Sequence, residues 1–277
     1  MGAVLHLAFL NLSVLGVAVV TLLLTGALLH VTERGVGRFV SHRLGWRAVL
    51  VTGWIGVPVH ELSHLVTAVL FRHRVVGWSL FDPDPTTGTL GYVRHAHTRP
   101  SLYQLAGNFF IGVAPLVGGS VVLALLLVWM VPPARLQALL DQSHFFALPA
   151  ADGDPTAAFG ADALVALGLR LIDLGGALLV QVWRDRTWWL PLQLYLCAAV
   201  AAHLAPSARD LVGGLRGALV LAVVLGAAAA ITAAVGASLS AVLLGVPVMI
   251  LLVALTTALQ GVYLLGAAAF AAVFGRR

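Results

Sequence analysis

Long apolar segments limit what this chain can fold into more than any other feature of its sequence. Segments of about 20 mainly apolar residues, the length that a helix needs to cross a bilayer, recur along the whole chain. Hydrophobic residues fill 60% of the 277 positions and charged residues only 10%. A water-soluble domain of this size cannot bury so much apolar surface. We therefore expect an all-α polytopic membrane protein with about six transmembrane helices. The predicted spans are residues 3–29, 48–71, 102–131, 187–205, 215–236 and 239–273.

One further segment, residues 161–183, leaves the number of spans open. Its pattern is helical, but it carries Arg170 and Asp173, whose spacing places both on one helical face. We interpret it as an interfacial helix, and a seventh span is the alternative. The sequence shows no fixed-period repeat and no extramembrane region large enough to fold alone. Residues 1–277 are thus predicted to form a single transmembrane domain.

The charged residues and the lone cysteine exclude several classes of protein. All 16 basic residues are arginines, and they are spread over short loops. Nucleic-acid binding requires a clustered basic face, so no nucleic-acid partner is expected. Cys197 is the only cysteine, which rules out an intrachain disulfide and an all-cysteine metal site. The expected surroundings are the lipid bilayer, and the oligomeric state stays open.

A short β-hairpin is predicted in the loop 72–100, directly after the second span. The runs "VVGWSLF" (75–81) and "TLGYV" (89–93) are rich in residues that favour strands. They flank "DPDPTTG" (82–88), whose prolines, aspartates and glycine are typical of turns.

Ionisable residues interrupt the second span in the stretch "GVPVHELSHLVTAVLF". His60 and His64 are four residues apart, so on a helix both face the same way and can bind one zinc ion. Glu61 lies beside them, where it can act as a general base for hydrolysis. With ten histidines and two glutamates in the chain, about 0.003 such H-E-x-x-H patterns are expected by chance. The alternatives are a cluster that only packs helices together and an inactive metal site.

A catalytic zinc ion needs a third protein ligand as well as an open position. Besides Glu61 the chain has only Glu33, which precedes the motif in the predicted loop 31–47, so the ligand should be an aspartate or a histidine. Asp210 lies in the region 203–216, where one span ends and the next begins, and His203 is the competing candidate. Asp210 also has a purely structural interpretation, because Ser207-x-x-Asp210 resembles a capping box.

Three polar residues elsewhere are further candidates. Asn108 lies inside the third span among small residues, where its amide can hold a substrate backbone or a developing oxyanion. An interhelical hydrogen bond is the alternative for Asn108. His95 and His97 of the hairpin loop alternate with Ala96, so they share one strand face, and we interpret them as solvated loop histidines.

Together these motifs resemble the site-2 protease family of intramembrane zinc metalloproteases. The resemblance covers residues 48 to about 216: "HELSH", a hairpin-like loop, "GNFFIGVAP" and then "SARDLVGG". It implies that His60 and His64 bind zinc, that Glu61 is the catalytic base and that Asp210 is the third ligand. It also implies that the hairpin presents an extended substrate by strand addition. The family's second motif is closer to Leu-Asp-Gly, whereas here leucine follows the aspartate. The chain has no PDZ-like insert and resembles a minimal or divergent member.

The expected function is therefore that of an intramembrane zinc metalloendopeptidase. Its substrates would be transmembrane proteins, cleaved in or near a membrane-spanning segment. The expected location is a bacterial cytoplasmic membrane, as a multi-pass protein. The rival hypothesis is a non-catalytic zinc-binding scaffold or transporter that reuses the fold. A transporter would show more polar groups along a path through the membrane, and the sequence has one polar focus.

Overall fold

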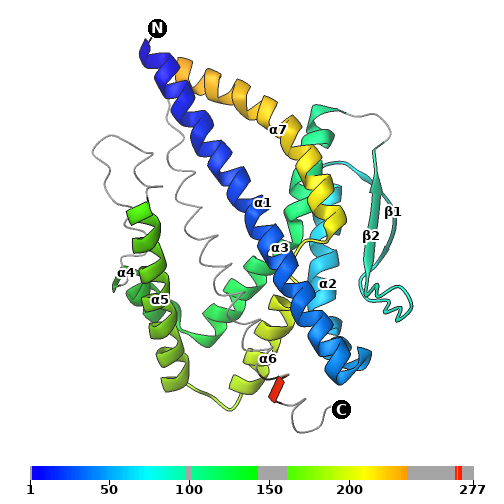
Figure 1. The fold of residues 1–277 in the computed structure, drawn as a ribbon. Helices are drawn as coiled ribbons and strands as arrows, with labels where there is room; N and C mark the ends of the chain where they lie inside the picture. The colour runs from blue at the N-terminus through cyan, green and yellow to red at the C-terminus, as the bar shows by residue number, and fades with distance from the viewer. Residues whose placement is uncertain (1, 98–100, 143–160, 236–265, 267, 270–277) are drawn as a thin grey trace. The chain divides into compact units, whose positions relative to one another are not determined.

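The computed structural model describes residues 2–97, 101–142, 161–235, 266 and 268–269. Over these residues the chain is mostly helical, and its strands form one two-stranded sheet (Figure 1). The elements, in chain order, are α1 (Gly2–Leu44), α2 (Trp46–Leu70), β1 (Arg74–Ser79), β2 (Tyr92–Ala96), α3 (Leu102–Met130), α4 (Pro133–Gln142), α5 (Ala161–Arg184), α6 (Leu190–Ala201) and α7 (Ala208–Ala234).

Three of the described helices, α2, α3 and α7, are long and apolar enough to cross a membrane. Each of them exposes large apolar side chains, for example Trp54 of α2, Leu125 of α3 and Leu219 of α7, which are 57%, 65% and 67% exposed. Side chains of this kind are expected to face lipid, since contiguous apolar surface is unfavourable in water. The sequence predictions at 48–71, 102–131 and 215–236 agree with these helices.

The structure differs from the predicted spans at two places. Helix α1 continues to Leu44, through most of the segment 31–47 that was predicted to be a loop. Val36 and Val40, one turn apart in that segment, are buried and pack against Ala48 and Val49, and this apolar contact favours the helix. The other difference is α6, which has 12 residues and is shorter than the predicted span 187–205. The predicted span 239–273 lies almost wholly outside the described residues.

The chain divides into two compact units, which we describe separately. One comprises Met1–Thr21, Leu127–Leu190 and Val224–Leu255, and the other comprises Leu22–Leu126, Pro191–Val223 and Thr256–Arg277. In the first unit, α4 packs on α5 around the buried side chains of Val131, Leu174 and Leu178. An ion pair between Arg135 and Asp185 also joins these two helices. All of the candidate site residues lie in the second unit.

Strands β1 and β2 form the predicted hairpin and pair antiparallel. The register places Val75 opposite His95 and Gly77 opposite Arg94, so the strand bulges at Val76. The turn is closed by the side chain of Asp84, which accepts hydrogen bonds from Thr86 and Thr87. The hairpin prediction is thus confirmed.

Small residues bring the helices of the second unit into close contact. Gly112 of α3 lies against the backbone of Asp210 and Gly214 in α7, where a Cβ atom at position 112 would overlap both. Gly118 of α3 likewise lies against the side chain of Ser63 in α2. Close backbone approach at small residues is a common means of packing helices in membranes. As a result, α2 and the first turn of α7 both lie against α3.

Candidate metal centre

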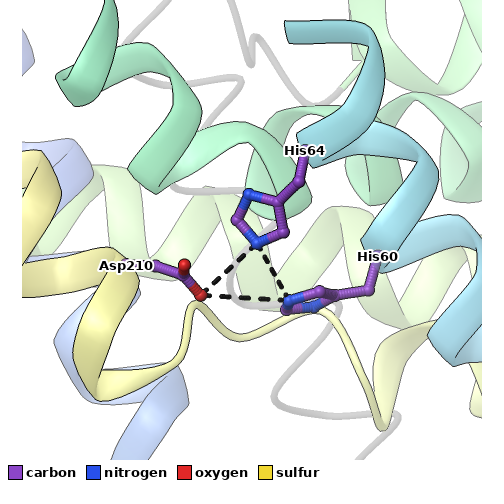
Figure 2. A group of neighbouring side chains, drawn as sticks. All are labelled: His60, His64 and Asp210. Atoms are coloured by element: carbon purple, nitrogen blue, oxygen red, sulfur yellow. Dashed lines mark hydrogen bonds and ion pairs between the residues drawn. The ribbon is translucent and has the colours of Figure 1, made fainter. Parts of the chain in front are cut away.

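The first two residues of the site come from one face of α2. His60 and His64 are one turn apart, and their Nε2 atoms lie 3.2 Å from each other. The two rings meet edge to face, with their centroids 4.9 Å apart. His64 is buried and His60 is half-buried. The spacing read from the sequence therefore does bring the two imidazoles together (Figure 2).

The third residue is Asp210, in the first turn of α7. Its Oδ2 atom lies 3.4 Å from Nε2 of His64 and 4.0 Å from Nε2 of His60 (Figure 2). The predicted capping box is also formed: the Ser207 N–H donates to Oδ2 of Asp210 at 2.7 Å, and the Asp210 N–H donates to Oγ of Ser207 at 3.2 Å. Asp210 therefore caps the start of α7 and faces the two histidines with the same carboxylate.

Backbone carbonyl groups set the orientation of both histidine rings. Nδ1 of His60 lies 2.8 Å from the carbonyl oxygen of His203, and Nδ1 of His64 lies 2.9 Å from that of Ile111. A carbonyl can only accept, so each Nδ1 must carry the ring hydrogen. In the neutral rings, each Nε2 atom is then left with a lone pair, which is the form that binds a metal.

A proline explains why the Ile111 carbonyl group is available. In an α-helix the carbonyl of residue i accepts from the N–H of residue i+4. For Ile111 in α3 that residue is Pro115, which has no N–H. The carbonyl oxygen therefore lacks its partner within the helix and accepts the hydrogen bond from His64 instead.

The three convergent atoms fit a cation well. Two neutral Nε2 atoms and a carboxylate are all acceptors, and acceptors at 3.2 to 4.0 Å repel one another unless a positive charge lies among them. In a tetrahedral zinc site with bonds of about 2.0–2.1 Å, ligand atoms are roughly 3.3 Å apart. His60, His64 and Asp210 are the only group of three potential ligands at metal-binding distance within the described part of the chain. The donor set of two imidazoles and one carboxylate suits zinc.

Glu61 is buried beside this group, with 8% of its surface exposed. It lines the same cavity as His60, His64 and Asp210. The hairpin reaches it at Gly91, where an added Cβ atom would lie 2.9 Å from Cγ of Glu61. A carboxylate at this place borders the ligand group without being one of its three members.

A cavity of about 880 Å³ opens at the ligand group. One wall is the hairpin segment 87–95, which includes most of β2, and another is formed by residues of the α6–α7 connection and the start of α7. Both apolar and polar atoms line it, in contrast to the apolar outer faces of the helices. The cavity is large enough for several residues of an extended peptide.

The other predicted candidates take different positions. Nε2 of the His203 ring lies 3.1 Å from Oγ1 of Thr52. Of the two candidates for the third ligand, the structure brings Asp210 to the histidine pair. Asn108 donates its side-chain amide to the Leu105 carbonyl of its own helix at 3.3 Å, and it does not line the cavity. A role for Asn108 in binding substrate stays a prediction.

The hairpin histidines are less solvated than the sequence suggested. Nδ1 of His95 lies 2.8 Å from Nδ1 of His73, whose Nε2 donates to the Gln104 carbonyl at 3.0 Å. His95 is half-buried and lines the cavity, and Nδ1 of His97 is buried. Burial and the neighbouring His73 lower the pKa of His95, which favours its neutral form.

Sequence reasoning missed the groups that hold the ligands. The His203 and Ile111 carbonyl groups are backbone atoms, which no residue pattern specifies. Pro115 was a usable signal for the second of them, since a proline inside a span always frees the carbonyl four residues earlier. Glu33 was treated only as a possible ligand and then set aside, although its carboxylate contacts the segment that precedes Asp210.

These observations define a predominantly helical chain with three helices able to cross a membrane and a group of two histidines and one aspartate at metal-binding distance. Comparison with known protein families, curated proteins and solved structures finds no match to the chain.

Proposed function

We propose that this chain is an intramembrane zinc metalloendopeptidase, which hydrolyses peptide bonds in or near transmembrane segments of other proteins. The observation that carries the proposal is the set of three acceptors, His60 Nε2, His64 Nε2 and Asp210 Oδ2, beside the buried carboxylate of Glu61. The cost of placing so many ionisable groups in and next to apolar helices favours a functional site over a packing cluster.

Each residue of the site has a defined role in this proposal. His60, His64 and Asp210 hold the ion, and the carbonyl groups of His203 and Ile111 keep the two rings in the tautomer that binds it. When bound, zinc supplies a Lewis acid that polarises the scissile carbonyl and lowers the pKa of water. The Glu61 carboxylate takes a proton from the attacking water and later gives it to the leaving amine.

The substrate class is inferred from the cavity and its surroundings. Strand β2 lines the cavity and pairs on one side with β1. An extended segment of substrate can bind along the hairpin by adding a strand. A transmembrane helix must unwind to present such a segment, which directs cleavage to the ends or to weak points of the span. The proposed setting is regulated intramembrane proteolysis by a multi-pass protein of a bacterial cytoplasmic membrane.

The test is a comparison of zinc content and cleavage in Glu61→Gln. The protein is purified in detergent and incubated with a panel of single-span model proteins, and products are identified by mass spectrometry. Wild type should cleave within or beside the span, and a zinc chelator should abolish cleavage until zinc is restored. Glu61→Gln should keep its zinc and lose cleavage, because the amide cannot accept the proton. Arg38→Gln, an exposed change on α1, is purified in the same way and is the control: it should keep both zinc and cleavage.

Two results would count against the proposal. Cleavage that survives Glu61→Gln would show that another group, or a contaminating enzyme, performs the reaction. Zinc bound to wild type without cleavage of any panel member would favour the alternative of a non-catalytic zinc-binding scaffold or transporter.

A further inference from the structure

Residues 203–207, in the connection between α6 and α7, contact two of the three side chains in the metal centre. The carbonyl of His203 accepts the Nδ1 hydrogen bond of His60 at 2.8 Å. At the other end, the Ser207 N–H donates to Oδ2 of Asp210 at 2.7 Å. A displacement of this connection would therefore change the orientation of His60 and the position of Asp210 together.

Two side chains of α1 hold the connection by its backbone. Oε2 of Glu33 accepts the hydrogen bond of the Ala205 N–H at 2.9 Å. Nδ1 of His30 lies 2.9 Å from the Pro206 carbonyl oxygen and donates to it. His30 and Glu33 are three residues apart, so they extend from the same face of α1.

Water has little access to the Ala205 N–H in this connection. Ala205 is 4% exposed, and Leu204 beside it is 2% exposed. A buried N–H without a partner costs free energy. The connection is therefore more stable in the position where the Glu33 carboxylate accepts the hydrogen bond of the Ala205 N–H.

We infer that Glu33 is a positioning residue of the metal centre, and that His30 supports it. Glu33 does not belong to the ligand group. It acts through the backbone of residues 203–207, which sets the His60 tautomer at one end and the Asp210 carboxylate at the other. The inference rests on the proposed zinc centre and is independent of whether the protein cleaves peptides.

Zinc affinity and the visible absorption of the cobalt-substituted protein test this inference. Both are measured on the full chain in detergent, by competition with a chelator and by the ligand-field bands that report the geometry around cobalt. Glu33→Ala should weaken zinc binding by about tenfold, as loss of an outer partner typically does, and should change the cobalt bands. Glu33→Gln keeps an acceptor oxygen and should remain within about twofold of wild type.

Two further variants complete the design. His30→Ala removes the second hydrogen bond and should also weaken zinc binding. Arg38→Ala, an exposed change on the same helix, is the matched control and should alter neither readout. If Glu33→Ala fails to fold, His30→Ala and Glu33→Gln decide the question.

The inference is overturned if Glu33→Ala, or His30→Ala in its place, binds zinc as tightly as Arg38→Ala with unchanged cobalt bands. It is also overturned if Glu33→Gln is as impaired as Glu33→Ala, because the hydrogen bond would then not be the cause. A wild type that binds no zinc would refute the metal centre itself. Zinc binding without cleavage would refute only the peptidase.

Discussion

Nδ1 of His60 lies 2.8 Å from the backbone carbonyl oxygen of His203. This hydrogen bond joins the helix that carries two ligands to the segment that leads into Asp210. It also fixes the ring tautomer, because a carbonyl oxygen cannot donate. The orientation of the first ligand and the location of the third are therefore coupled. Outer partners of this kind raise metal affinity by holding the ligands in place.

Restoring the helix hydrogen bond that Pro115 removes should weaken the centre. In Pro115→Ala the new N–H competes with His64 for the Ile111 carbonyl, since that carbonyl lies one turn earlier in α3. We expect zinc affinity to fall by up to about tenfold while α3 itself is no less stable. Chelator competition measures the affinity, with the exposed Val117→Ala on α3 as control. Equal affinities in the two variants would refute this role for Pro115.

Packing at Gly112 should control the position of Asp210. A methyl group at this site overlaps the backbone of Asp210 and Gly214, so α7 must move away from α3. Gly112→Ala should destabilise the protein by about 1–3 kcal/mol, the usual range for overpacking, and reduce its zinc content. Gly213→Ala is the matched control, because nothing lies within 4 Å of its added Cβ atom. Thermal unfolding and metal analysis of both variants check the prediction, and normal zinc content in Gly112→Ala contradicts it.

The hairpin turn should be sensitive to acid through Asp84. Hydrogen bonds from Thr86 and Thr87 lower the pKa of this carboxyl from 3.8 to about 2. A group whose pKa is lower in the folded state stabilises the fold above its unfolded pKa, about 3.9, and loses that contribution as the pH falls. The turn should therefore loosen between these two pH values. Carboxyl NMR chemical shifts of Asp84 follow the titration, and a midpoint near that of an unfolded aspartate would contradict the prediction.

The same turn has a direct control. Asp84→Asn cannot ionise, so the local stability of its turn should not change over that acid range. Exchange of the Thr86 amide hydrogen measures this stability, after the intrinsic pH dependence of exchange is subtracted.

How much the sequence could predict depends on the range of the interaction concerned. The hairpin and the shared face of His60 and His64 follow from local periodicity, and both are present. Asp210 came from a short list of candidates, because its approach to α2 depends on the packing of α7 against α3 at Gly112. No local pattern carries that information.

The errors in the sequence analysis have a similar origin. The segment 31–47 is rich in arginine and was predicted as a loop, yet buried Val36 and Val40 make most of it part of α1. That extension of the helix brings Glu33 to the α6–α7 connection. The prediction gave more weight to the polar residues on the exposed face of this segment than to the apolar residues on its other face. Packing of that apolar face against other residues of the chain favours the helix.

The central claim is tested most directly by the zinc content of three proteins: wild type, Asp210→Ala and His203→Gln. Zinc is measured by mass spectrometry after the same brief chelator wash of each protein. Wild type should retain one zinc ion per chain, and His203→Gln should retain it as well, because its backbone carbonyl still orients His60. Asp210→Ala should lose most of its zinc, since two imidazoles alone bind weakly. Full zinc in Asp210→Ala, or none in wild type, would contradict a centre built from His60, His64 and Asp210.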